Sequence, residues 1–141
     1  MELEDWQLSL KNGNKCFDKF EYSAAESYYF EAFDLLEQKL LVAPNCRETL
    51  FAWTATCHNL STLFERSGEL RLALHYLNTP HNYCHKMLVT DRSDSIALMQ
   101  AMNVTWQAIQ KFSKKNPAFI KANADQVPSR SALNLPNSQL H

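Results

Sequence analysis

The chain has 141 residues, of which 14 are basic and 15 are acidic, so its net charge is −1 at neutral pH. This balance argues against a general nucleic-acid-binding protein, which is usually strongly basic, and gives no electrostatic attraction to an anionic membrane. Hydrophobic residues make up 45% of the chain, enough for one sizeable core, and the presence of only two glycines, Gly13 and Gly68, favours helices over tightly turned strands.

Three helices are predicted first along the chain, from apolar residues that recur three and four positions apart. The first covers residues 3–20, and the second covers residues 22–42 and is ended by Pro44. The third covers residues 47–66. Gly68 ends the third helix, because glycine readily takes the left-handed conformation of a helix C-terminus.

The second half of the sequence predicts three further helical segments. A helix begins at residue 69 and meets Thr79 and Pro80, where either the helix kinks or a new one starts and continues over residues 81–89. Polar residues 91–94 offer caps for a helix over 95–116, and Pro117 opens a short one that extends to residue 125. We therefore predict a helical domain at 1–126 and a tail rich in Pro, Ser and Asn at 127–141.

We expect neither a secretion signal nor a membrane span. The first residues lack a basic stretch followed by an apolar one, and no run reaches the roughly 18 apolar residues of a membrane span. We expect a cytoplasmic protein. The four cysteines form no CxxC pair, so we interpret them as reduced apolar residues: Cys16, Cys46, Cys57 and Cys84.

A repeat with an offset of 48 residues relates the first half of the chain to the second. Cys16, Phe20, Tyr22, Ala25 and Tyr29 correspond in this way to Phe64, Gly68, Leu70, Ala73 and Leu77, and Gly13 corresponds to Ser61. A poorer third copy follows at an offset of 49, which aligns Cys57, Leu60, Leu70 and Ala73 with Trp106, Ile109, Phe119 and Ala122. Periodic self-similarity of this kind is typical of helical repeat proteins.

The repeated residues resemble the tetratricopeptide repeat, in which small and aromatic residues alternate on two helices. The resemblance covers residues 6 to 125 and implies a right-handed stack of about three antiparallel helix pairs. The period exceeds the usual one of about 34 residues, so the helices are expected to be extended. Pro80 departs from the repeat, because it stands where a small residue is usual. The alternative is an ordinary helical bundle.

The resemblance also implies a groove lined by the first helix of each pair, in which a peptide or partner protein binds. The predicted groove residues are Asn14, Asp18, His58, Thr62, Arg66, Gln107, Lys111, Lys114 and Lys115. Four of them, Arg66 and the three lysines, form a basic group that suits an acidic segment or a C-terminal carboxylate. The alternative is that these lysines form a solvated helix end. Leu10 stands where the carboxylate-binding version of the repeat has a lysine.

A group of His and Cys residues, His81, Cys84 and His85, is the best candidate for metal chemistry, since two His and one Cys can bind zinc. Their spacing matches no standard zinc motif, so structural roles are the alternative. The common catalytic motifs are absent. We therefore expect neither an enzyme nor a cofactor.

The leading hypothesis for function is an adaptor that binds a protein or peptide and neither nucleic acid nor membrane. One alternative is a self-associating protein whose tail at 127–141 fills the groove, with Tyr28 and Phe30 as candidates for a homodimer seam. A small chaperone of bacterial secretion is another, by likeness of fold. A metal-binding protein that uses His81, Cys84 and His85 is the third.

Overall fold

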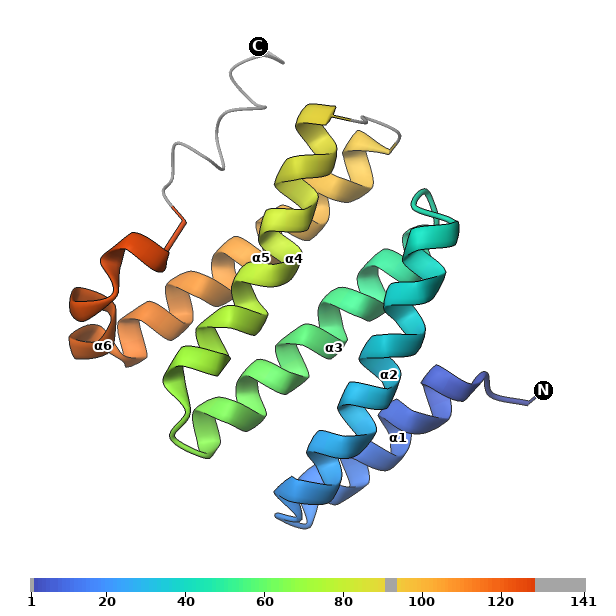
Figure 1. Ribbon diagram of the computed structural model, residues 1–141, viewed down its shortest axis with the longest axis horizontal. Coiled ribbons are helices and arrows are strands. Elements are labelled where there is room, and N and C mark those ends of the chain that lie inside the picture. Colours follow the sequence, from blue (N-terminus) through green and yellow to red (C-terminus); the bar gives the residue numbers. More distant parts are fainter. Residues whose placement is uncertain (1, 91–93, 129–141) are drawn as a thin grey trace. The chain divides into compact units, whose positions relative to one another are not determined.

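The computed structural model describes residues 2–90 and 94–128, which form six α-helices and one 3₁₀ turn (Figure 1). The all-α prediction is confirmed. Residues 129–141, most of the predicted tail, lie outside the described residues. The elements are α1 (Asp5–Asp18), α2 (Tyr22–Val42), α3 (Arg47–Arg66), α4 (Leu70–Thr90), α5 (Ser95–Lys115), α6 (Pro117–Ala122) and η1 (Ala124–Gln126).

The predicted interruption at Pro80 is the main difference between sequence and structure. One continuous helix, α4, contains Pro80, so the alternative of a new helix starting there is wrong. The hydroxyl of Thr79 donates a hydrogen bond to the carbonyl of His75 at 2.8 Å, in the turn that precedes the proline. Both Pro80 and its neighbour His81 are buried, so packing of this face stabilises helical backbone that the proline disfavours.

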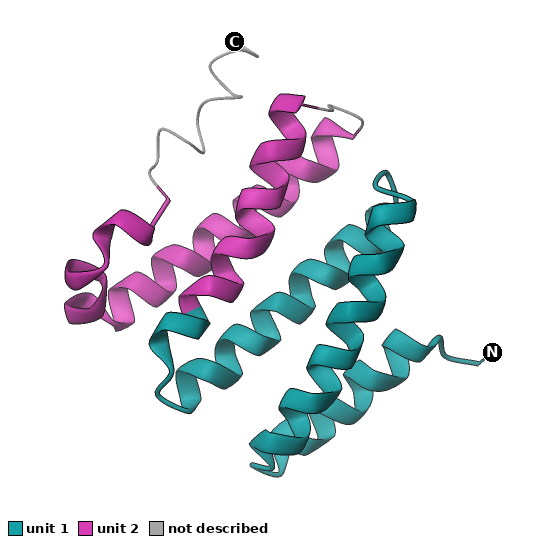
Figure 2. Ribbon diagram, viewed as in Figure 1, with its two compact units in different colours: residues 1–73 teal, residues 74–141 magenta. Residues whose placement is uncertain are grey.

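The chain divides into two compact units, residues 1–73 and 74–141, and each is described by itself (Figure 2). Unit 1 contains α1, α2, α3 and the first turn of α4, and unit 2 contains the rest. The boundary lies inside α4, whereas the predicted boundary at residue 126 stays a prediction. Across the described ranges, every helix is too short or too polar to cross a membrane.

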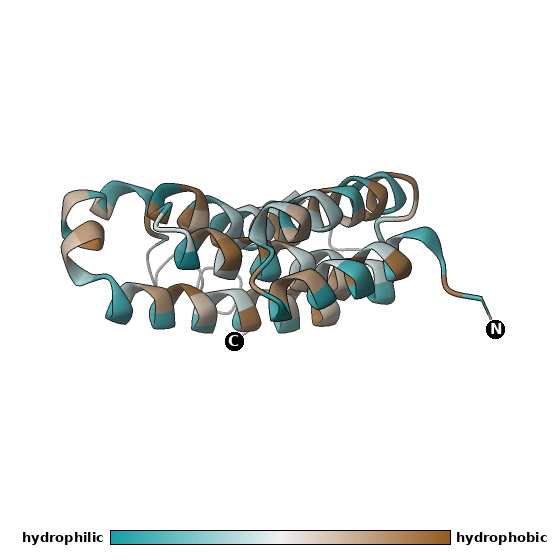
Figure 3. Cartoon of the chain, turned by 90° about the horizontal axis from the view of Figure 1, so that it is seen from below, coloured by the Kyte–Doolittle hydropathy of each residue, from teal (hydrophilic) through white to brown (hydrophobic). Residues whose placement is uncertain are grey.

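The core of unit 1 forms because apolar residues recur on one face of each helix, a pattern that Figure 3 shows as alternating hydrophobic and hydrophilic residues. Ala25 and Leu36 of α2, and Cys57 and Leu60 of α3, have no exposed surface. Phe30, considered above for a homodimer seam, lies with its ring 6.2 Å from that of Phe64 of the same unit. Further buried residues of the unit are Trp6, Tyr29, Ala32, Leu40, Leu50, Trp53, Leu63 and Ala73.

The turns after α1 and after α3, both in unit 1, have the same pattern of hydrogen bonds. After α1, the N–H of Glu21 donates to the carbonyl of Cys16 at 2.9 Å, and after α3 the N–H of Glu69 donates to that of Phe64 at 2.8 Å. Each turn has a second, shorter-range hydrogen bond. The N–H of Phe20 donates to the carbonyl of Phe17 at 3.0 Å, and the N–H of Gly68 donates to the carbonyl of Glu65 at 3.1 Å. These are the two bonds of the Schellman motif, and all four pairs obey the offset of 48 residues.

Unit 2 is organised around a buried hydrogen bond between α4 and α5. His81 Nδ1 lies 2.8 Å from Thr105 Oγ1, and the His81 ring lies 6.3 Å from that of Trp106. The helix α5 begins with Asp94, whose side chain accepts a hydrogen bond from the N–H of Ala97 at 3.1 Å, as predicted for a cap. At the other end of α5, Phe112 packs edge-on against Phe119 of α6.

Candidate functional site

Five of the predicted groove residues belong to unit 1, on α1 and α3. Asn14 and Asp18 of α1, and Thr62 and Arg66 of α3, are exposed, and His58 is half-buried. Asn14 also has a structural role, because its Oδ1 accepts a hydrogen bond of 2.7 Å from the hydroxyl of Tyr29. Burial raises the pKa of Tyr29 to about 12, with the Asp18 carboxylate adding to the effect, so the phenol keeps its proton.

An aromatic cluster with one arginine lies at the turn between α1 and α2, next to the predicted residues Asp18 and Arg66. The ring of Tyr22 lies 5.3 Å from that of Phe17 and 6.3 Å from that of Phe20. The guanidinium carbon of Arg66, at the end of α3, lies 5.3 Å from the centre of the Phe17 ring, within the range of a cation–π interaction. We call these four residues, Phe17, Phe20, Tyr22 and Arg66, the aromatic cluster.

Phe20 is the most unusual member of the aromatic cluster. Its side chain is 75% exposed, and its backbone φ is +63°, a left-handed conformation that disfavours residues with a Cβ atom. Gly68, which occupies the same place in the second turn, has φ of +81°. The structure therefore places a large exposed ring where the repeat uses glycine. The aligned sequences pair Phe20 with Gly68, which was the available signal for this residue, and the groove prediction missed it.

The remaining four predicted residues, Gln107, Lys111, Lys114 and Lys115, belong to unit 2. All four are exposed on α5, and Lys114 and Lys115 lie in its last turn, where a positive charge interacts favourably with the helix dipole. Arg66 belongs to unit 1, so the structure describes the predicted basic group in two separate parts. The three lysines nevertheless form a local basic surface at the end of α5.

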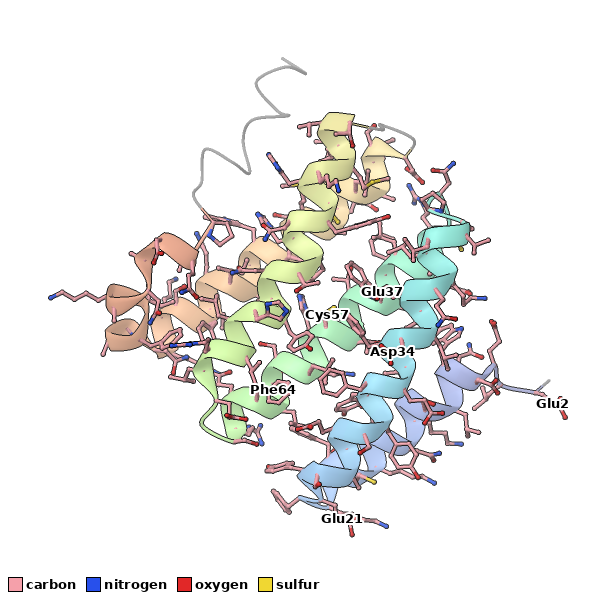
Figure 4. The ribbon with its side chains drawn as sticks, in the orientation of Figure 1. Glu2, Glu21, Asp34, Glu37, Cys57 and Phe64 are labelled. Carbon is pink, nitrogen blue, oxygen red and sulfur yellow. The ribbon has the colours of Figure 1, made fainter. Side chains whose placement is uncertain are left out.

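The charges of the chain are divided between its two units. Residues 1–73 contain seven basic and twelve acidic side chains, a net charge of −5, whereas residues 74–141 contain seven basic and three acidic ones, a net charge of +4. The overall charge of −1 hides this division. Figure 4 labels four of the acids of unit 1: Glu2, Glu21, Asp34 and Glu37. The electrostatic field around residues 1–73 is therefore opposite in sign to that around residues 74–141.

A groove of about 520 Å³ lies within unit 1, between the start of α1, the end of α2 and the start of α3. We call it the N-terminal groove. Its apolar lining comes from Trp6, Leu35, Val42 and Ala43, and its polar lining comes from Glu4, Asp5, Gln38, Lys39, Cys46, Glu48 and Thr49. Sequence reasoning missed this groove, because its residues come from three separate segments with no common period.

Cys46 has the most distinctive chemistry in the N-terminal groove. It is the residue that precedes α3, and its sulfur accepts a hydrogen bond from the hydroxyl of Thr49 at 3.2 Å. This bond and the backbone N–H groups at the start of α3 lower the pKa of the Cys46 thiol, since they stabilise the thiolate. Cys46 is half-buried, whereas Cys57 and Cys84 are fully buried.

The residues considered for metal binding do not assemble into a site. In the parts of the chain that the structure describes, no three His, Cys, Asp or Glu side chains come together in a way that would hold a metal ion. His81 is bonded to Thr105, and burial lowers its pKa to about 4. Burial also raises the pKa of Cys84 to about 12, which disfavours the thiolate that binds metals. These two residues are therefore core residues of unit 2.

These features define a small all-α protein of sequential helix pairs, with two structurally matching turns and two exposed candidate surfaces in its first unit. The chain belongs to the family described as "Protein of unknown function (DUF2753)", which matches residues 4–139. The comparisons with curated proteins and with solved structures gave no match.

Proposed function

We propose that this protein is an interaction module that resembles the tetratricopeptide repeat and binds a segment of another protein through the aromatic cluster of unit 1. The observation that carries the proposal is the placement of Phe20, a 75% exposed aromatic ring on a left-handed backbone. Strained backbone of this kind is found disproportionately at functional sites. Beyond its edge-on contact with Tyr22, the Phe20 ring buries little surface in the folded chain, whereas a binding partner that covers the ring would remove the rest from water.

The composition of the aromatic cluster supports an interface. Aromatic residues and arginine are enriched at the centres of protein–protein interfaces, and a few such residues usually supply most of the binding energy. The stacking of Arg66 on Phe17 orients the guanidinium with less loss of side-chain entropy on binding. Two further predicted groove residues are exposed near members of the cluster in the sequence: Asp18 directly follows Phe17 on α1, and Thr62 lies one turn before Arg66 on α3.

The repeated turn supports the repeat-like part of the proposal. The ends of α1 and α3 share the same hydrogen bonds at an offset of 48 residues, and each is followed by an alanine, Ala25 or Ala73, that is fully buried. Small buried residues at such positions let the paired helices approach closely. Helical repeat proteins commonly present a binding surface of this type.

The proposal is tested by affinity capture with the full-length protein, followed by quantitative mass spectrometry. Phe20→Gly and Arg66→Ala variants are compared with the natural chain, because Phe20→Gly removes the ring and leaves a residue suited to the turn. We expect both variants to lose the same captured proteins. Leu72→Ser is the control, since Leu72 is an exposed apolar residue of unit 1, at 37%, outside both the aromatic cluster and the N-terminal groove. Undiminished capture by both cluster variants would contradict the proposal.

A further inference from the structure

We propose that the N-terminal groove is a second binding surface, and that its ligand is an extended, basic peptide segment with an apolar side chain next to a lysine or arginine. This inference goes beyond the proposed function, which uses the aromatic cluster. The carrying observation is that one groove combines an apolar floor with a rim that is predominantly acidic.

The apolar floor gives the groove its capacity to bind a side chain. Trp6 is 8% exposed and Val42 is 87% exposed, so the floor extends from the core to the surface of unit 1. The volume of about 520 Å³ lies within the roughly 300–1,000 Å³ range of ligand-binding pockets. An apolar side chain that enters this groove is removed from water together with the floor, which is the main favourable contribution to such binding.

The charges at the rim select a basic ligand. Three carboxylates line the groove, from Glu4, Asp5 and Glu48, against one cation. That cation, Lys39 Nζ, lies 3.3 Å from Oε1 of Glu4, so it offsets one of the carboxylates and leaves Asp5 and Glu48, which are exposed. Because residues 1–73 carry a net charge of −5, the surrounding field also attracts cations and repels an acidic segment.

The neighbouring residues favour an extended peptide over a compact small molecule. Leu41, which is 78% exposed, directly precedes the groove-lining residue Val42, and Leu3, which is 49% exposed, directly precedes the groove-lining residue Glu4. Exposed apolar side chains are therefore sequence neighbours of the groove lining in two places, at the start of α1 and at the end of α2. A peptide that places one side chain in the groove has further side chains with which to cover such surface.

Two half-buried cysteines allow the two surfaces of unit 1 to be distinguished in one experiment. Cys46 lines the N-terminal groove, whereas Cys16 is next to Phe17 of the aromatic cluster. The full-length protein is treated with iodoacetamide, and mass spectrometry follows the alkylation of each cysteine. The probes are an acetylated decapeptide that alternates leucine with arginine and a second decapeptide that alternates leucine with glutamate.

We expect the basic decapeptide to slow the alkylation of Cys46 about tenfold at ten times its Kd, because about one groove in eleven is then empty. Cys16 should react at an unchanged rate, and the acidic decapeptide should protect neither cysteine. An Asp5→Asn and Glu48→Gln double variant should weaken binding of the basic peptide by about two- to tenfold. Glu37 is an exposed acidic residue of α2 that lies outside the groove, and it is labelled in Figure 4. The Glu37→Gln variant should bind the basic peptide with unchanged affinity.

Val42→Ser tests the apolar floor separately from the charges. Val42 is so exposed that its replacement spares the core, and loss of its contact should weaken peptide binding by about fivefold. An unchanged rate at Cys46 with the basic peptide, or equal protection by the acidic one, would overturn the inference. Protection of Cys16 alone would also overturn it and would support the aromatic cluster. Protection of Cys46 that rises with protein concentration in the absence of peptide would show a second copy in the groove instead.

Discussion

A Cβ atom added to Gly13 of α1 would lie 2.6 Å from Cε1 of Tyr29, well inside normal contact distance. The ring of Tyr29 is fixed by its own burial and by the hydrogen bond to Asn14, so it has little freedom to move away. The contact explains why a glycine stands in the middle of a helix, where it is otherwise unfavourable by about 1 kcal/mol. Gly13 therefore marks a point of close packing between α1 and α2.

Gly13→Ala should therefore destabilise the protein by about 1–3 kcal/mol, although alanine is the better helix former. Urea unfolding followed by circular dichroism measures the change in the free energy of unfolding. Lys11→Ala, an exposed substitution on the same helix, is the control for helix propensity and should stay within about 0.5 kcal/mol of the natural chain. A stabilised Gly13→Ala variant would show that the close contact is absent.

Phe20→Gly should increase the free energy of unfolding by about 0.5–1 kcal/mol, because it relieves the strain of a left-handed residue with a Cβ atom. The gain is reduced by the loss of the edge-on contact with Tyr22. Gly68→Ala is the reverse experiment and should destabilise by about 1 kcal/mol, since nothing lies within 4 Å of its added Cβ and only the backbone conformation is at issue. Thermal unfolding of both variants should give shifts of opposite sign.

His81 should make the protein less stable as the pH falls. The hydroxyl of Thr105 donates its proton to the carbonyl of Met102 at 2.9 Å, so it accepts a hydrogen bond from His81 Nδ1–H. The Nε2 of His81 is then the unprotonated nitrogen, and it is buried with no partner among the described residues. Burial, which disfavours the charged ring, lowers the pKa of His81 to about 4, and the neighbouring His85 adds to the effect.

The direction of this pH dependence follows from the protonation states of His81 in the folded and unfolded chains. Between pH 6.5 and 4 the unfolded chain binds a proton at His81 and the folded chain does not. The free energy of unfolding should therefore decrease by about 3 kcal/mol as the pH is lowered from 6.5 to 4. Burial also lowers the pKa of His58, which adds a loss of the same sign. His81→Gln should flatten the dependence when urea unfolding is repeated from pH 7.5 to 4. An equally steep dependence in that variant would contradict the assignment.

The four cysteines should differ in reactivity in a fixed order. Cys46 should react first with iodoacetamide near neutral pH, because hydrogen bonds at the start of α3 lower the pKa of its thiol and it is half-buried. Cys57 and Cys84 have no exposed surface, so they should react only after addition of denaturant. Thr49→Val should slow the reaction of Cys46 by removing one hydrogen bond to its sulfur. Peptide mapping by mass spectrometry measures all four rates.

The sequence predicted most helices well, because their signals are local. The bounds of α2 and α3 match the prediction, and α5 differs by one residue, since apolar periodicity and the Pro44 and Gly68 breaks mark these ends. The α1 helix is shorter than predicted, beginning at Asp5 and ending at Asp18. The failure lies in the alternative of a new helix at Pro80, where a local rule was outweighed by the burial of Leu77 before the proline and His81 after it.

The candidate surfaces were harder to predict, because each depends on tertiary structure. The repeat alignment indicated Asp18 and Arg66, and the structure adds Phe20 and Tyr22 through contacts across a turn. The N-terminal groove joins residues more than 40 positions apart, from Glu4 to Thr49, with no common motif. No periodic pattern in the sequence indicates that these residues lie close together, so the groove can be recognised only from the packing of the three helices.

The boundary between the two units lies inside α4, between Ala73 and Leu74, with no linker on either side. The carbonyl of Ala73 also accepts a hydrogen bond of 2.7 Å from Ser61, so the first turn of this helix is attached to α3. A recombination event at this boundary would cut a helix and leave a single isolated turn, which is too short to persist in water. The acidic first unit and the basic second unit are thus joined by one continuous helix, and neither can be cut from the other without breaking α4.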